Sequence, residues 1–382
     1  MIIASRKPLI SIISAFAAGL CFLASAGIGK EGAEKKESDD VLVFDLHADT
    51  LYQNLNKGVG IKKNDCHVDL EKMQKGKYLA QVFAIWVKPG KGWKTVEKMA
   101  ATFWKWKSKN NTRLALATTG SQIWKARLGG QVAGVLGIEG LSPLEGDMGK
   151  IDKLYDFGVR VIGLTWFDSN DFAGTSNSKD KRGTYGLTEK GIKLVERANE
   201  LGMVIDVSHA SDRTVLDVAE YSTDPFIASH SCAKALMDIE RNLSDELLAV
   251  IGKKGGVIGV NFHRAFVAPK PRDQVTMKDV VDQIVHISKA AGIDAVALGS
   301  DFDGAGPPAD LDSAEKMQDL ARALKKRGFT SEEVHKIMYL NAWRVFAAVT
   351  QKKDLKEITG HLLPEGMLAG RRQPQALTAT PY

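Results

Sequence analysis

The sequence predicts a (β/α)8 barrel, an α/β fold of the TIM-barrel type, over residues 41–350. Short apolar runs rich in β-branched residues recur eight times, and most are continuous, as is typical of strands buried on both faces. Segments with apolar residues at helical spacing lie between them, and this alternation indicates a parallel sheet. Eight such units in 382 residues fit a closed barrel.

The eight expected strands follow one another along the chain. They are residues 41–49, 78–87, 131–140, 159–168, 203–211, 225–231, 255–263 and 295–303. Among the segments between them, residues 188–202, 276–292 and 313–328 have the spacing and the closing glycine of helices. An open doubly wound sheet is the alternative, but the G-x-G-x-x-G fingerprint that would follow its first strand is absent.

Acidic and imidazole side chains stand where five of these strands end. They are His47, Asp49, Glu139, His209, His230, Asp301 and Asp303. His47 and Asp49 are two residues apart, so they would project to the same side of an extended strand. Because the carboxyl ends of barrel strands meet at one mouth, where active sites lie, we expect one cluster there.

The composition excludes few functions but gives no support to nucleic-acid binding. The chain has 52 basic and 46 acidic residues, a formal net charge of +6, and no long basic block. Its 44% hydrophobic and 26% charged residues are ordinary for a globular protein.

The first 26 residues have the pattern of a signal peptide. Arg6 and Lys7 precede the apolar stretch 8–24, and Ala24-Ser25-Ala26 offers a small-residue cleavage site. We expect cleavage after Ala26 and export, to the periplasm or outside the cell, with no stable membrane insertion afterwards. A retained anchor is the alternative, but the apolar stretch is short for a spanning helix.

Two further segments are expected to lie outside the barrel domain. Residues 27–40 are charged and contain glycine, which predicts a flexible leader, and residues 351–382 lack periodicity, which predicts a C-terminal extension and tail. Signal cleavage would leave Cys66 and Cys232, too few for a disulfide framework. The sequence does not decide whether these two pair.

The cluster at the strand ends has the chemistry of a metal site. Three histidines with aspartate and glutamate are typical ligands of zinc or a similar divalent ion. They exceed the three protein ligands of a single catalytic zinc and suit two ions, which polarise a carbonyl and lower the pKa of water. The residues therefore indicate a metal-assisted hydrolase, with amide, ester, lactone and phosphoester substrates all open.

Six motifs occur in the order found in one hydrolase family. They are DLHADTL (45–51), GIEG (137–140), DVSHAS (206–211), ASHSCAKAL (228–236), RNLSDE (241–246) and GSDFDG (299–304). In these, from about residue 41 to about 350, the chain resembles the membrane (renal) dipeptidases, peptidase family M19 of the metal-dependent hydrolase superfamily. The resemblance implies a TIM-barrel dipeptidase with two Zn²⁺ per chain, often tolerant of a D-residue at the C-terminal position of the dipeptide.

The resemblance also implies roles for single residues. It makes metal ligands of the five residues His47, Asp49, Glu139, His209 and His230, with Glu139 bridging both ions. Asp301 would be the general base beside a metal-bridging hydroxide and would later protonate the leaving amine. Arg241 would hold the substrate carboxylate, for which a guanidinium fork is well suited.

The chain departs from the family after the fourth strand. Trp166 stands where many members have a histidine that contacts substrate and stabilises the oxyanion. We expect its ring to wall the substrate pocket. Asp168, Asn170 and His263 are alternative substrate-binding candidates by strand position.

Two other functions remain open from the sequence. Another binuclear amidohydrolase-type enzyme, such as a lactonase, deaminase or phosphotriesterase, is the first alternative. A secreted binding protein that has lost catalysis is the second, although the intact set of ligand candidates argues against it. Dipeptides are the expected substrates, and the habit of the family implies a homodimer.

Overall fold

A computed structural model describes residues 40–180 and 185–351 of the chain. The predicted signal peptide, nearly all of the predicted leader and the predicted tail after residue 351 lie outside the described residues. The described residues belong to one compact unit, to which the following description refers.

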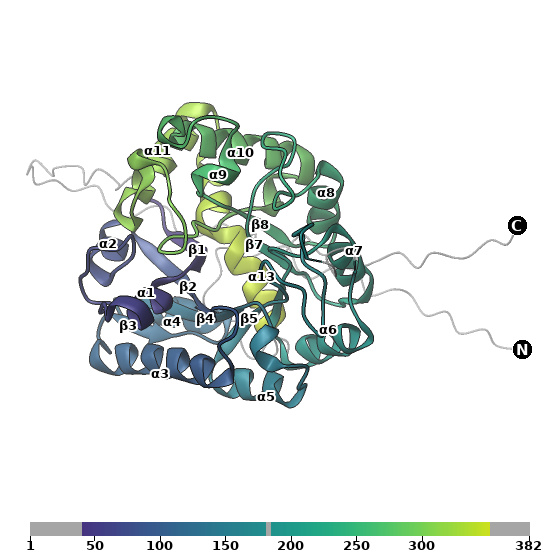
Figure 1. The fold of residues 1–382 in the computed structure, drawn as a ribbon. Helices are drawn as coiled ribbons and strands as arrows, with labels where there is room; N and C mark the ends of the chain where they lie inside the picture. The colour runs from purple at the N-terminus through teal and green to yellow at the C-terminus, as the bar shows by residue number, and fades with distance from the viewer. Residues whose placement is uncertain (1–39, 181–184, 352–382) are drawn as a thin grey trace, which may run out of the picture. The chain divides into compact units, whose positions relative to one another are not determined.

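Eight parallel strands close into a barrel (Figure 1). They are β1 (Val43–Ala48), β2 (Tyr78–Trp86), β4 (Val132–Glu139), β5 (Val159–Gly163), β6 (Val204–Asp206), β7 (Ile227–Ser231), β8 (Val257–Val260) and β9 (Val296–Leu298). Each pairs with the next in this order, and β9 returns to β1. The predicted fold and its eight strands are thereby confirmed.

A ninth strand, β3 (Leu114–Leu116), lies outside the ring. It pairs with residues 132–134 of β4, whereas β5 pairs with residues 136–139 of the same strand. Three residues make too short an apolar run to be read as a strand, so the sequence did not predict it.

Helices surround the barrel and connect its strands (Figure 1). They are α1 (Thr50–Lys57), α2 (Leu70–Lys75), α3 (Trp93–Lys109), α4 (Gly120–Leu128), α5 (Gly149–Asp156), α6 (Glu189–Leu201), α7 (Asp212–Tyr221), α8 (Asp245–Lys253), α9 (Arg264–Val267), α10 (Met277–Ala291), α11 (Met317–Arg327), α12 (Ser331–His335) and α13 (Asn341–Thr350). The three predicted helices correspond to α6, α10 and α11. None of the helices in the described part of the chain has the length and apolar character that a membrane span requires.

Local chemistry explains where these helices begin and end. The Thr188 hydroxyl accepts the backbone N–H of Gly191 at the start of α6, and Gly202 ends that helix in the left-handed conformation, at φ 72°. Thr276 and Asp279 form a reciprocal capping box on α10. Helix α11 begins later than predicted because residues 314–316 form a 3₁₀ turn.

Helix α13 covers the end of the barrel at which the strands begin (Figure 1). Its buried residues Ala342, Val345, Phe346 and Val349 pack with apolar side chains from the first half of most barrel strands. The Phe346 ring meets Phe44 edge-on, with centroids 6.1 Å apart. With this end closed by apolar packing, the opposite end is left for polar side chains.

Candidate active site

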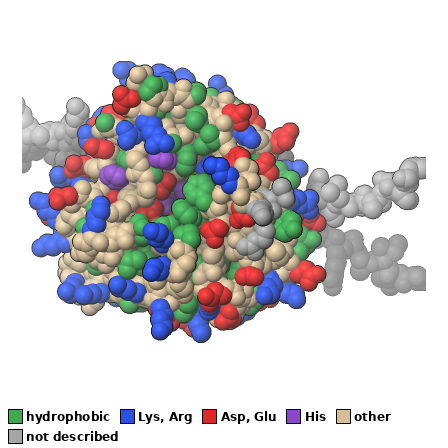
Figure 2. All heavy atoms as spheres, in the orientation of Figure 1, with side chains coloured by type: hydrophobic (Ala, Val, Ile, Leu, Met, Phe, Trp, Pro, Cys, Tyr) green, Lys and Arg blue, Asp and Glu red, His purple; other side chains and the backbone are tan. Residues whose placement is uncertain are grey.

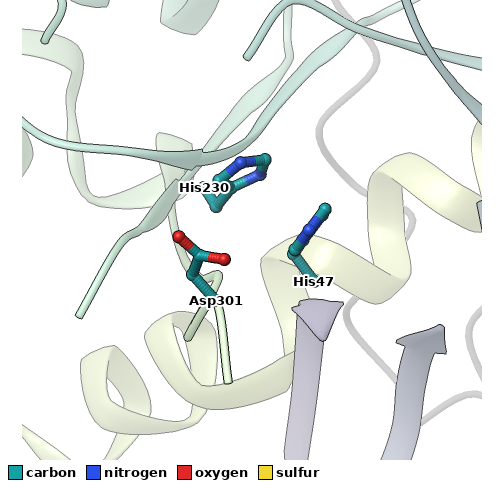
Figure 3. Close-up of side chains that lie close together, drawn as sticks. All are labelled: His47, His230 and Asp301. Atoms are coloured by element: carbon teal, nitrogen blue, oxygen red, sulfur yellow. The ribbon is translucent and has the colours of Figure 1, made fainter. Parts of the chain in front are cut away.

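The six residues predicted to form the metal and catalytic cluster come together at the carboxyl ends of the strands. His47 is in β1, Asp49 directly follows it, Glu139 ends β4, His209 follows β6, His230 is in β7 and Asp301 follows β9. Figure 3 shows His47 at the tip of β1 with His230 and Asp301 beside it. Near the middle of the face drawn in Figure 2, histidine and acidic side chains are visible next to hydrophobic ones.

Glu139 lies at the centre of this cluster. Its Oε2 is 3.5 Å from Nε2 of His47, and its Oε1 is 3.0 Å from Nε2 of His209 and 3.5 Å from Nε2 of His230. The same Nε2 of His47 is 3.3 Å from Oδ2 of Asp49. The two oxygens of the Glu139 carboxylate therefore face different histidines: Oε2 faces His47, and Oε1 faces His209 and His230.

The donor atoms fit divalent metal ions. His47 with Asp49 and Glu139 makes one group of ligand atoms within 4.8 Å of one another, and Glu139 with His209 and His230 makes a second. A third, of His47, His230 and Asp301, overlaps both. Within the described residues, Nε2 of His47 is buried and makes no hydrogen bond, although two carboxylate oxygens lie within 3.5 Å of it. Nε2 of His209 is 3.0 Å from Nε2 of His230. Such converging nitrogens and carboxylates in a buried site suit a cation.

The pKa values of the two neighbouring histidines favour metal binding. Burial, together with Arg241, lowers the pKa of His209 to about 4, and burial with the charge of His47 places the pKa of His230 well below its usual range. Both imidazoles are therefore neutral near pH 7, the form that binds a metal ion.

The pKa values of two carboxyl groups in the cluster are shifted in opposite directions. Burial alone would raise the pKa of Glu139, but the charge of His47 and contacts with three histidines hold it well below its usual range. Burial raises the pKa of Asp301 to about 7; nearby Asp49 and Glu139 add to this effect and His47 opposes it. Glu139 is thus anionic, whereas Asp301 is poised to exchange a proton near neutrality.

Hydrogen bonds behind His230 select its tautomer. The Ser229 hydroxyl donates to Oδ2 of Asp206 at 2.6 Å, so at 2.7 Å from Nδ1 of His230 it accepts the ring proton. Nε2 then carries a lone pair toward the cluster. Asp206 also accepts the backbone N–H groups of Ser208 and Ser229, which joins β6 to β7.

Asp45 plays the corresponding part between β1 and β9. It accepts the backbone N–H of His47 at 3.3 Å and both the N–H and the hydroxyl of Ser300, at 2.8 and 2.6 Å. The sequence analysis did not assign Asp45 or Asp206. The available signal was an aspartate at the end of an apolar run, two residues before His47 and three before His209.

Three of the acidic and imidazole residues predicted at the strand ends have left-handed backbone conformations. They are His209, Asp301 and Asp303, with φ of 67°, 59° and 69°. Asp303 anchors its turn, since it accepts the Thr50 hydroxyl and the backbone N–H of His67, each at 2.6 Å. Non-glycine residues in this region of φ are uncommon and concentrate at functional sites.

Arg241 lies beside the cluster and is 5% exposed. Its Nη1 donates to the Ser231 hydroxyl at 2.8 Å and its Nη2 to the carbonyl of His230 at 2.6 Å. Its Nε–H is buried and has no partner among the described residues. The guanidinium is therefore held against β7 with its Nε–H unused.

Trp166 and His263 lie on different sides of the mouth. Trp166 packs edge-on against Trp86, with centroids 4.9 Å apart, and its ring is 6.4 Å from that of His209. His263 follows β8, where its Nδ1 accepts the N–H of Gly306 at 3.3 Å and its ring packs on Phe266. Asn170 holds its own loop, since its side chain donates to the carbonyl of Leu164.

A cavity of about 240 Å³ opens beside Glu139. Residues of the segments 87–92 and 139–145 line it, together with Trp166 and Asp168. Trp86, in register with Glu139 in the neighbouring strand, supports the wall behind Trp166. Cys66 and Cys232 are both free thiols, and neither lines this cavity.

Comparison with known proteins places these features in one family. The model of the membrane dipeptidase family, peptidase family M19, matches residues 35–358. An uncharacterised dipeptidase of Schizosaccharomyces pombe is 37% identical over 227 residues, and the dipeptidase VerJ of Clonostachys rogersoniana is 34% identical over 257. These matches cover 58% and 66% of the chain but only 54% and 65% of the relatives' lengths.

The fold agrees with this assignment. The crystal structure of a dipeptidase described as a metallopeptidase of family M19 superposes with a TM-score of 0.75 at 26% identity. The match covers 81% of this chain and 99% of the other.

Proposed function

Since this chain belongs to the membrane dipeptidase family, peptidase family M19, we propose that it is a zinc-dependent dipeptidase that hydrolyses the peptide bond of free dipeptides. One observation carries the proposal. Glu139 stands between two groups of metal-ligating atoms, and the Arg241 guanidinium lies within the same mouth with an unused donor. This arrangement places an ion site next to a carboxylate-binding group.

Two zinc ions would be held by the two donor groups that share Glu139. His47 and Asp49 complete one group, and His209 and His230 complete the other. Bound zinc ions would polarise the scissile carbonyl and lower the pKa of water at the site. The neutral imidazoles of His209 and His230 and the anionic Glu139 need not first lose a proton, whereas the charges of Glu139 and Asp49 raise the pKa of His47, which would release its proton to the ion.

Asp301 is proposed as the general base and acid. Asn261 Nδ2 donates to its Oδ2 at 3.0 Å, which leaves Oδ1 for a proton. A pKa of about 7 allows this carboxylate to take a proton from water and give it to the leaving amine at neutral pH.

Arg241 is proposed to bind the terminal carboxylate of the substrate. A dipeptide presents that charge one residue from the scissile bond, whereas a long chain does not. Because Ser231 and the His230 carbonyl already orient the guanidinium, little of its freedom is lost on binding. The proposal includes dipeptides with a D-residue at the C-terminal position, as the resemblance implied.

Trp166 is proposed to wall the pocket, because it packs on Trp86 at the edge of the cavity beside Glu139. His263 lies across the mouth on the β8 side and remains a candidate contact for the C-terminal residue of the substrate. Export through residues 1–26 and a homodimeric assembly also belong to the proposal.

A substrate panel tests this function on the zinc-loaded full chain. It would contain L,L- and L,D-dipeptides, their C-terminal amides, a lactone and a phosphotriester. We expect free dipeptides to be the best substrates. Arg241→Ala should reduce kcat/KM for them by roughly 10-fold or more, the loss of a hydrogen bond to a charged group, and spare the amides.

The exposed Arg322 supplies the control, because Arg322→Ala removes the same charge far from the mouth. A preference for the lactone or phosphotriester, without turnover of dipeptides, would favour the alternative binuclear hydrolase. Zinc in the protein without turnover of any substrate would favour a binding protein.

A further inference from the structure

The cavity beside Glu139 is lined by two acidic side chains that have no part in the proposed chemistry, Asp168 and Glu145. Asp168 lines it and follows Trp166 by two residues on the loop after β5. Its Oδ2 accepts a 2.5 Å hydrogen bond from the Ser142 hydroxyl. No lysine, arginine or histidine in residues 40–180 and 185–351 forms an ion pair with Asp168. Among the described residues, its charge is therefore oriented by Ser142 but not paired with a cation.

The other charged groups of the cavity are accounted for. Glu139 is surrounded by the three histidines, and Glu145 forms an ion pair with Lys150 at 3.0 Å. Lys91 lies on the exposed rim, where water screens its charge. Asp168 is thus the acid available to a ligand inside the cavity.

We propose that Asp168 and Trp166 bind a positively charged amine on the N-terminal half of the substrate, an inference that rests on the dipeptidase function proposed above. A carboxylate held by Ser142 offers a charge-assisted hydrogen bond to an ammonium group. The indole of Trp166 lines the same cavity and packs against Trp86, and an aromatic ring at such a place can also attract a cation.

The arrangement of the mouth gives the substrate its direction. Arg241 is bound to β7, whereas the cavity lies at the ends of β2, β4 and β5, with Glu139 between the two. A dipeptide whose carboxylate meets Arg241 therefore extends its N-terminal half toward Asp168. Either the α-ammonium of that residue or an ammonium on its side chain would satisfy the site.

Three substrates separate these two sources on the zinc-loaded full chain. Alanyl-alanine carries only the α-ammonium, N-acetyl-lysyl-alanine only the side-chain ammonium, and N-acetyl-alanyl-alanine neither. Asp168→Asn should lower kcat/KM by roughly 10- to 100-fold, the effect of losing a hydrogen bond between charged groups, for the substrate whose amine binds there. N-acetyl-alanyl-alanine should be unaffected. Asp171→Asn makes the same change on an exposed residue of the same loop, outside the cavity, and serves as the control.

A binding measurement keeps this test separate from turnover. Calorimetric titration should show that the wild-type chain binds alaninamide, or lysinamide acetylated at its α-amine, more tightly than N-acetylalaninamide. Asp168→Asn should remove that difference while zinc content and melting temperature stay those of the control. If the wild type cleaves no dipeptide but shows this difference, the proposed function fails and the ammonium site stands. Equal binding of all three amides, or equal losses on all three substrates, would overturn the site even in an active dipeptidase.

Discussion

Glu139 shows how single residues determine the electrostatics of this mouth. Removing a carboxylate from water favours its protonated form, but three imidazoles within 3.5 Å outweigh that effect and hold its pKa well below the usual range. Asp301 lies within 4.8 Å of imidazole nitrogens of His47 and His230, but burial outweighs the charge of His47 and its pKa rises to about 7. Two carboxyl groups of one cluster thereby acquire different protonation states, as an anionic ligand and a proton carrier require.

Asp301→Asn should separate proton transfer from metal binding. Asparagine has nearly the same shape but cannot exchange a proton, so kcat on free dipeptides should fall by roughly 10²- to 10⁴-fold. Zinc content, measured by atomic absorption, should stay near that of the wild type because five ligand candidates remain. Asp273→Asn, at an exposed position, is the control. Loss of zinc in parallel with kcat would instead make Asp301 a ligand.

Among the elements, helix α13 stabilises the end of the barrel opposite to the candidate active site. It closes the amino-terminal end of the strands with apolar side chains, while the ligand candidates stand at the carboxyl ends. Gly120, at the start of α4, allows this helix to approach, since a Cβ there would lie 2.4 Å from Cβ of Ala347. Packing of α13 therefore stabilises the strands that carry the candidate site, without contacting the site residues.

Phe346→Ala should destabilise the fold without a direct effect on the site. Truncating this buried ring leaves a void against Phe44, and such changes typically cost about 3–5 kcal/mol. Urea unfolding of the zinc-loaded protein measures the loss, with Ala348→Ser on the exposed face of the same helix as control. An unchanged unfolding midpoint would show that α13 does not contribute to the core as described.

At the scale of the whole molecule, repulsion between the carboxylates of the candidate site makes the stability of the fold depend on metal binding. Asp49, Glu139 and Asp301 lie close together in a buried region, and burial raises the pKa of Asp49 as well as that of Asp301. Cations between them would relieve this repulsion. A ligand that binds only the folded chain stabilises it by an amount that grows with its concentration.

Removing the metal should therefore lower the melting temperature. Zinc at 1,000 times its dissociation constant would contribute about 4 kcal/mol, so excess EDTA should produce a clear downward shift in calorimetry. EDTA already saturated with zinc is the control. Glu139→Gln should reduce the shift, because it takes a charged oxygen from both donor groups. A melting temperature that EDTA leaves unchanged would contradict the two-ion site.

The sequence by itself determined the barrel fold and which residues lie at the carboxyl ends of its strands. Eight buried runs specify parallel strands, and parallel strands in a barrel end on the same side, so His47, Glu139, His209 and His230 could be grouped without knowing any distance. This inference needs only local patterns and one topological rule.

Only the tertiary structure decided how the mouth is supported and shaped. Three features depend on contacts between residues far apart in the chain. They are helix α13 at the end of the barrel, the buried Asp45 and Asp206 behind the histidines, and the packing of Trp86 on Trp166 beside Asp168. A hydrophobic helix or an aspartate near a strand has the same local pattern whether it faces the core, a neighbouring strand or a cavity. The partner that gives it a role is chosen by the closure of the barrel, which no local pattern encodes.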